Sequence, residues 1–247
     1  MERRLLGIMT HRIGSPGRFR KHALAAAAAG FEGVVLFTPW DVRTDKKRIV
    51  GYVSVKGGPW QRRLCSYPGT AIDVGYYTSP SSVSRAVRVK NTPIRFTGYG
   101  LGNKWTIQQH LLKSERIVPH LLPTERMRTI ADAFQFAGEH GAIMIKPING
   151  KGGKGILKLA KADGGWSLRA NGKSTVHGTE RTIARILRVW KSKGGCVLQR
   201  WIDIRNDEGR VFDIRSLVQK NGEGRWQTTG IAVREGRSGS ITSNLKS

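Results

Sequence analysis

Short apolar runs alternate with turn-forming residues in the first third of the chain. LLGIM at 5–9 and GVVLF at 33–37 favour buried strands, and GRFRKHALAAAAAG at 17–30 favours a helix that ends at its final glycine. A strand, a helix and a second strand at this spacing predict a parallel βαβ unit. Residues 49–100 are rich in turn-forming residues, and further short strands are expected at IVGYVSV and AIDVGYY.

The middle of the chain has helical spacing. Asn103 is a good N-cap for a helix over KWTIQQHLLK, and PHLLPT at 119–124 predicts an extended linker because of its two prolines. Thr124 is then expected to cap a helix that runs to His140 and ends at Gly141. The apolar face of this predicted helix has spacings of three and four residues, at Met127, Ile130, Phe134 and Ala137.

Strand patterns dominate the remainder of the chain. AIMIK, GILKLAK and WSLRA are followed by a helical pattern from Thr179 to Trp190, and then by CVLQRWI, VFDIRSLVQK and RWQTTGIAVR. The stretches ADGG and NGEG predict hairpin turns. The change in pattern predicts an N-terminal α/β domain over residues 1–100 and an α+β domain over residues 101–247.

Composition adds a strong positive charge to this picture. Lys and Arg total 43 against 17 Asp and Glu, a formal net charge of +26, which attracts polyanions. Cys65 and Cys196 are far apart and outside any CxxC motif, so a metal cluster is not predicted and reduced thiols are expected. The N-terminus lacks the apolar core of a signal peptide, and no apolar run reaches membrane-spanning length. We therefore expect a cytoplasmic protein with no membrane association.

The stretch KPINGKGGKGI at 146–156 is the strongest candidate for chemistry. GKGGKG fits GxGxxG, but no crossover helix follows it, which disfavours a dinucleotide fingerprint, and Ile156 follows the last glycine, which excludes a Walker A motif. A protein kinase would need HRD and DFG motifs, which the sequence lacks. The pattern predicts a hairpin loop whose backbone N–H groups approach phosphate oxygens, with Lys146, Lys151 and Lys154 adding positive charge. The alternative is a surface hairpin whose lysines only solubilise it.

In order and spacing, several motifs resemble the ATP-grasp superfamily, and most closely its YheC/YheD family of endospore coat-associated proteins. The resemblance covers residues 100–245 densely and the N-terminal third more loosely. Its motifs are NKW at 103–105, PHLLPT, IKPINGKGGKGI, VLQRWIDI, GRVFDIRSLVQKNGEGRWQTTGIAVREG and GSITSNL. The resemblance implies an N-terminal Rossmann-like pre-ATP-grasp domain of α/β type, followed by an α+β ATP-grasp fold that lacks its last elements.

The resemblance also implies roles for individual residues around ATP and Mg²⁺. Lys104 and Lys146 would reach the phosphates, and the flap over them would be built from Gly150, Gly152, Gly153, Lys154 and Gly155. The adenine-binding hinge would include Gln199 and Trp201, with Asp203 near the ribose. Asp213 would bind the metal, and Arg215, Arg234 and Asn244 would surround the transferred phosphoryl group. From the residues alone, Lys104, Gln199 and Arg234 could equally be ordinary surface side chains, and Asp213 and Arg215 a surface ion pair.

The chemistry implied is activation of a carboxylate by ATP through an acyl-phosphate that an amine then opens. The sequence departs from the superfamily pattern because no Glu-x-Asn metal-binding element occurs in it, so it is expected to be a fragment or a short form with impaired metal binding. The carboxylate and amine substrates are not identified by the sequence.

Three functions therefore stay open. The first is a ligase-like ATP-grasp protein of the spore coat, and the second is a non-catalytic coat or scaffold protein that keeps the nucleotide-binding fold, with an acidic coat partner to match its charge. The third, a nucleic-acid binder, is disfavoured because its best candidate stretch, HRIGSPGRFRKH, has one aromatic residue and no RNP-like motif.

Overall fold

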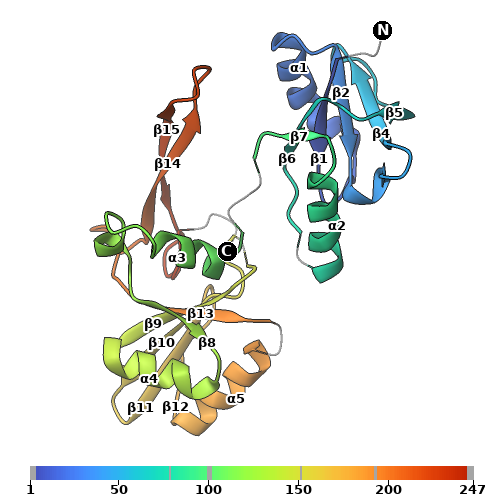
Figure 1. The fold of residues 1–247 in the computed structure, drawn as a ribbon. Helices are drawn as coiled ribbons and strands as arrows, with labels where there is room; N and C mark the ends of the chain where they lie inside the picture. The colour runs from blue at the N-terminus through green and yellow to red at the C-terminus, as the bar shows by residue number, and fades with distance from the viewer. Residues whose placement is uncertain (1–3, 78, 99–101, 151, 192–193, 244–247) are drawn as a thin grey trace. The chain divides into compact units, whose positions relative to one another are not determined.

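The chain folds into two compact units, residues 1–100 and residues 101–247. The computed structural model describes residues 4–77, 79–98, 102–150, 152–191 and 194–243. Figure 1 shows the elements of each unit, which we describe separately.

The first unit contains a seven-stranded sheet in the order β3-β4-β2-β1-β6-β7, with β5 also paired to β4. Its strands are β1 Leu5–Met9, β2 Gly33–Phe37, β3 Val42–Arg43, β4 Arg48–Val55, β5 Gln61–Ser66, β6 Thr70–Asp73 and β7 Arg95–Phe96. Its helices are α1 Arg20–Ala28 and α2 Pro80–Lys90, with 3₁₀ turns at Pro16–Phe19 and Pro39–Asp41. The parallel pairing of β1 with β2 and of β1 with β6 gives the α/β character that the sequence predicts.

The predicted βαβ unit is confirmed, but the sequence analysis missed α2. Every residue of β2 is buried, as its unbroken apolar run indicates. Helix α2 begins at Pro80, and the Ser79 side chain accepts a hydrogen bond from the Ser82 backbone N–H. Proline in the first turn and serine at the N-cap are helix-start signals. Among so many Gly, Pro and Ser residues, these signals were interpreted as turns.

The second unit contains a six-stranded sheet in the order β12-β11-β10-β9-β13-β8 and a separate two-stranded hairpin, β14-β15. The strands of the six-stranded sheet are β8 Thr124–Met127, β9 Ala142–Pro147, β10 Leu157–Ala162, β11 Gly165–Ala170, β12 Val176–Gly178 and β13 Cys196–Arg200. The hairpin consists of β14 Phe212–Lys220 and β15 Trp226–Glu235. The helices are α3 Lys104–Leu111, α4 Ile130–His140 and α5 Glu180–Lys191, with a 3₁₀ turn at Val118–His120.

Helices α4 and α5 cover one face of the six-stranded sheet and form the core of the second unit (Figure 1). Ile143, Leu159 and Leu198 from three different strands are completely buried in this core. Each such side chain contributes about 1.5–3 kcal/mol through the burial of apolar area. Because successive strand residues point to opposite faces, the intervening side chains lie on the face away from the two helices.

The prediction of a helix from Thr124 is wrong for its first turn. Residues Thr124–Met127 form β8, which pairs antiparallel with β13. The helix begins at Ile130, because Thr129 and Asp132 form a capping box in which each side chain accepts a backbone hydrogen bond from the other residue. The linker prediction at 119–124 is also only partly right, since Val118–His120 is a 3₁₀ turn.

The hairpin β14-β15 is much more exposed than the rest of the second unit (Figure 1). Ile214, Ile231 and Val233 lie on one face of the hairpin and are 66–70% exposed. Within the part of the chain that the structure describes, no helix has the length and apolarity to cross a bilayer.

Candidate functional site

The face of the six-stranded sheet away from α4 and α5 carries the polar side chains of the candidate site. Lys146 of β9 is opposite Val197 of β13, and Gln199 is opposite Met144. This register places Lys146 and Gln199 on the same face, while their neighbours Ile145 and Leu198 point into the core. The sheet thus separates a dry, packed side from a side that presents charge.

Lys146 is a mostly buried cation with a neutral partner. Its Nζ donates a hydrogen bond to Gln199 Oε1 at 2.5 Å, and Gln199 Nε2 donates to Thr124 Oγ1 at 2.9 Å. This chain of donors and acceptors sets the orientation of the Gln199 amide. Burial lowers the pKa of Lys146 below the ordinary lysine value, and the positive charge of Lys104 lowers it further.

Lys104 approaches the same region from the start of α3. Asn103 caps this helix by accepting a hydrogen bond from the Thr106 N–H, as predicted, and this fixes the direction of the next side chain. Lys104 Nζ donates to Pro147 O at 3.0 Å and also to Gly150 O. Burial lowers the pKa of Lys104 as well.

The two ammonium groups donate hydrogen bonds to carbonyl and amide oxygen atoms. Among the described residues, neither Lys104 nor Lys146 forms an ion pair with a carboxylate. Burial and the positive charge of Lys104 both disfavour the charged form of Lys146, and a nearby anion would offset this cost. The pair is therefore a candidate site for a negative ligand.

The glycine loop lies beside this pair and joins two antiparallel strands. Strands β9 and β10 pair from Leu157 opposite Ile145, so the predicted strand–loop–strand arrangement is confirmed. Gly152, Gly153 and Gly155 have φ values of +66°, +76° and +71°, which only glycine adopts without strain. Lys154 is exposed on the loop, and the predicted Lys151 lies outside the described residues.

Gly150 and Gly155 are also places of close approach. A Cβ at Gly150 would come within 3.2 Å of the Pro147 side chain. A Cβ at Gly155 would come within 3.0 Å of Pro147 Cγ and 3.1 Å of Trp190 Cζ3. The loop therefore packs against the end of β9 and against α5 at Gly150 and Gly155, its first and last glycines.

The segment after β13 brings an aromatic residue beside a further cation. Lys158 Nζ lies 4.1 Å from the centre of the Trp201 ring. The backbone N–H of Trp201 donates a hydrogen bond to Ala142 O. Burial lowers the pKa of Lys158. Asp203, by contrast, accepts hydrogen bonds from Arg205 Nε at 2.8 and 3.0 Å, which lowers its pKa to about 2. Asp203, the residue predicted to meet the ribose, is thus exposed and hydrogen-bonded to Arg205.

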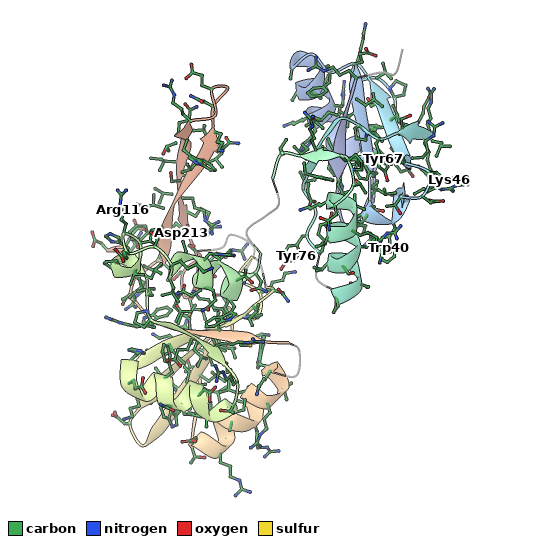
Figure 2. All side chains as sticks on the ribbon, viewed as in Figure 1. Trp40, Lys46, Tyr67, Tyr76, Arg116 and Asp213 are labelled. Carbon is green, nitrogen blue, oxygen red and sulfur yellow. The ribbon has the colours of Figure 1, made fainter. Side chains whose placement is uncertain are left out.

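Asp213, Arg215 and Arg234 form a second cluster at the base of the hairpin. Asp213 is labelled in Figure 2. Arg234 donates to both oxygens of Asp213, at 2.9 and 2.6 Å, and to Ser243 Oγ at 3.2 Å. Arg215 Nη2 lies 3.4 Å from Asp213 Oδ2. These donors, Arg234 first, lower the pKa of Asp213 to about 2. Asn244, the remaining predicted catalytic residue, lies outside the described residues.

The carboxylates present do not fit a magnesium site. Both oxygens of Asp213, the predicted ligand, already accept hydrogen bonds from Arg234. Mg²⁺ requires six oxygen ligands in near-octahedral geometry, with one or two carboxylates among them. The described residues contain no group of three or more His, Cys, Asp or Glu side chains able to hold a metal ion. The chemistry of this donor set is that of an ion-pair clamp.

Two residues on the charged face were missed in the sequence analysis. Lys158 is opposite Met144 and Arg169 is opposite Lys158, so both share the face of Lys146. Arg169 Nη2 donates to Gly239 O at 2.5 Å and so ties the C-terminal turn to the sheet. The alternation in LKLAK gave the signal for Lys158, because alternate residues of a strand share a face and Lys158 lies between the core residues Leu157 and Leu159.

The sequence has relatives among characterised proteins, although it spans only part of their length. It is 27% identical over 228 residues to the endospore coat-associated protein YheC of Bacillus subtilis (strain 168), covering 85% of this chain and 61% of YheC. It is 30% identical over 148 residues to the endospore coat-associated protein YheD of the same organism, covering 58% of this chain and 33% of YheD.

Structural comparison gives the same fold at lower identity. The chain matches N5-carboxyaminoimidazole ribonucleotide synthetase, solved as its ADP complex, with a TM-score of 0.52 and 12% identity, covering 95% of this chain and 55% of that one. The fold is therefore that of the ATP-grasp proteins. The pattern of the YheC/D-like ATP-grasp family matches residues 93–247, well over half of the sequence. The chain belongs to the YheC/D-like ATP-grasp family.

Proposed function

We propose that the second unit binds ATP with its phosphate groups between Lys104, Lys146 and the glycine loop. The observation that carries this proposal is the pair of partly buried ammonium groups that have no carboxylate partner among the described residues. Burying two like charges near one another is costly unless an anion joins them. A polyphosphate supplies several negative oxygens over the width of such a site.

The nucleotide base would lie further along the same face of the sheet. Gln199 offers a polar edge, and Trp201 offers an aromatic surface beside Lys158. Asp203 is proposed to meet the ribose, which requires it to exchange its contact with Arg205 for one with the sugar hydroxyls. The loop from Gly150 to Gly155 would close over the phosphates through its backbone N–H groups.

The reaction that this site supports best is ATP-dependent ligation of a carboxylate to an amine. A carboxylate oxygen of the substrate attacks the γ-phosphorus, the bond to the β-phosphate oxygen breaks, and ADP leaves. The amine nitrogen then attacks the acyl carbon, inorganic phosphate leaves, and the nitrogen loses a proton. The protein's contribution is to hold the groups in position and stabilise the negative charge that develops.

Individual residues have separate tasks in this scheme. Lys104 and Lys146 neutralise the phosphates of the bound nucleotide. Asp213 orients Arg234 through two hydrogen bonds, and Arg234 with Arg215 is proposed to meet the transferred phosphoryl group. The described residues do not form a metal site, so no step is assigned to Mg²⁺.

A binding-only role in the spore coat is the second candidate function. It is favoured by the engagement of Asp213, whose carboxylate is held by Arg234 where the family pattern suggests a metal ligand. In this role the nucleotide would stabilise the fold, and the excess positive charge would bind an acidic partner of the coat. The names of the two Bacillus relatives support the location for either candidate.

Calorimetric titration with ATP, with and without Mg²⁺, tests the shared part of both candidates. We expect Lys146→Met and Lys104→Met each to weaken ATP binding by about 10- to 100-fold, since each removes a charge-assisted contact worth about 1.5–3 kcal/mol. The matched control is Lys220→Met, which removes the same charge from the exposed hairpin. If all three variants bind ATP equally well, the proposed site is wrong.

Release of ADP separates the two candidates. Wild-type protein is incubated with ATP and mixtures of carboxylic acids and amines, and ADP is measured over time. ADP formation that depends on both additions and is lost in Arg234→Gln supports the ligase. ATP binding without turnover under every mixture supports the binding-only role.

A further inference from the structure

A basic hollow lies in the first unit, on a part of the sheet that α2 does not cover. Helix α2 is held at one end of the sheet, where Arg85 donates to the carbonyl oxygens of Pro39 and Val42. The hollow lies where β1 and β6 begin, is lined by residues that include Leu5 and Thr70, and has a volume of about 660 Å³. This size is typical of sites for small organic ligands.

The lining of the hollow is in part apolar. Leu5 and Val53 belong to the same core cluster as the interior of the sheet, and Phe31 follows α1 at the same end. An apolar surface left open to water loses the stabilisation that burial would give it. A ligand with an apolar body would restore it.

Three arginines line the same hollow, and neutral neighbours hold each of them in place. Arg48 Nη1 donates to Ser66 Oγ at 2.8 Å, and Arg63 Nη2 donates to Gln61 Oε1. The guanidinium carbon of Arg4 lies 5.3 Å from the centre of the Phe31 ring. Across residues 4–77 and 79–98, none of these three guanidinium groups forms an ion pair with a carboxylate.

We propose that this hollow binds a small organic anion, with a carboxylate or phosphate group held by the arginines and an apolar body against Leu5, Phe31 and Val53. Guanidinium groups recognise both oxyanions through paired N–H donors. The site is independent of the proposed nucleotide site, because it lies wholly within the first unit.

Four related probes test the proposal by calorimetry on the full chain. 1-Naphthyl phosphate and 1-naphthoate carry both the anion and the apolar body, inorganic phosphate carries only the anion, and 1-naphthol only the apolar body. We expect one or both naphthyl anions to bind more tightly than inorganic phosphate and 1-naphthol. The tighter of the two identifies the anionic group that the site prefers. Equal binding of 1-naphthol would contradict the role of the arginines.

Variants locate the binding and separate it from general attraction to a basic protein. The double variant R48A/R63A should weaken binding of the naphthyl anion by about tenfold or more. The matched control R62A removes a neighbouring β5 arginine that pairs with Asp41 at 3.8 Å and does not line the hollow. Binding should be unchanged in R62A and in Lys146→Met. Equal losses in R62A and in the double variant would overturn the proposal.

Cys65 provides a second readout that does not depend on a variant. Its side chain lines the hollow, whereas Cys196 is buried in the second unit. Saturating 1-naphthyl phosphate should slow alkylation of Cys65 by iodoacetamide and leave the rate at Cys196 unchanged, as measured by mass spectrometry. Unchanged alkylation of Cys65 with the probe bound would place the ligand elsewhere and refute the proposal.

Discussion

The two charged regions of the second unit are built on opposite principles. Lys146 of the six-stranded sheet and Lys104 of α3 donate hydrogen bonds to neutral oxygen atoms, and burial lowers the pKa of both. At the base of the hairpin, Arg234 is matched by Asp213 through two hydrogen bonds. The positive charges of the two lysines are therefore left without a carboxylate partner among the described residues, whereas the charge of Arg234 is balanced by Asp213.

The difference suits the two regions to different roles: the lysine pair to ligand binding, and the arginine–aspartate cluster to holding the fold together. Lys146 lies on a sheet whose other face is packed against a core, whereas Lys104 lies at the start of α3 and reaches the end of β9 through its hydrogen bond to Pro147 O. The hairpin has little buried surface, and a hydrogen bond from Arg234 to Ser243 Oγ links it to the C-terminal turn. The lysines carry charge for which an anion is the proposed partner, whereas the arginine–aspartate cluster links the exposed hairpin to the C-terminal turn.

The largest effect is expected from breaking the rigid support. Leu198→Ala should lower the free energy of unfolding by about 2–5 kcal/mol, because this fully buried side chain leaves a cavity. Ile231→Ala on the hairpin, where the side chain is 70% exposed, should change it by about 0.5 kcal/mol or less. Chemical denaturation measures both, and similar losses would show that the hairpin is not the looser region.

The glycines of the two regions should respond differently as well. Gly155→Ala should cost about 2–3 kcal/mol, from the strain of positive φ together with the clash against Pro147 and Trp190. Gly224→Ala in the hairpin turn, with φ of +79° and open space around it, should cost only about 1 kcal/mol. Equal costs in thermal unfolding would mean that the glycine loop does not pack as described.

Removing the charge of Lys146 should stabilise the protein while weakening the proposed binding of ATP. Lys146→Met should raise the free energy of unfolding at neutral pH by on the order of 1 kcal/mol, because a buried charge without an acidic partner is replaced by an apolar side chain. The folded-state pKa is lowered, so the cost is fully present below that pKa. It disappears as pH rises toward the ordinary lysine value. A gain that grows with pH, or a loss of stability, would contradict this.

The smallest effect concerns the clamp at the hairpin base. Arg234 lowers the pKa of Asp213 to about 2, so the clamp stabilises the fold above the ordinary aspartate pKa and loses this contribution as pH falls toward 2. Because the pair is partly exposed, the contribution is about 0.2–1 kcal/mol. Arg234→Gln should flatten the acid limb of the stability profile, and an unchanged profile would show that the ion pair contributes nothing measurable.

Much of the fold could be predicted from local pattern. The buried run of β2 and the glycine loop between β9 and β10 have signals within a few residues, and both predictions are confirmed. Strand β8 could not be predicted in this way, because only its pairing with β13, some 70 residues away, makes Thr124–Met127 extended. Thr129 and Asp132 carry the helix-start signal in the sequence, but the predicted N-cap, Thr124, lies five residues before the observed one.

The candidate site was less accessible to sequence reasoning than the fold. Lys146 and Gln199 are 53 residues apart, and their contact follows from the register of two strands that no local pattern specifies. The engagement of Asp213 by Arg234 across the hairpin similarly depends on long-range pairing. The sequence could nominate these residues, but only the structure distinguishes the uncompensated lysines from the compensated arginines.

Burial disfavours the charged form of Lys146 in the free protein, and bound nucleotide is proposed to relieve this. Lysine-selective NMR of its Cε–Nζ group, assigned by comparison with Lys146→Met, measures its pKa directly. We predict a pKa below the ordinary lysine value without ligand, rising when ATP is added because phosphate oxygens stabilise the charged form. An ordinary pKa that ATP does not change would contradict the account.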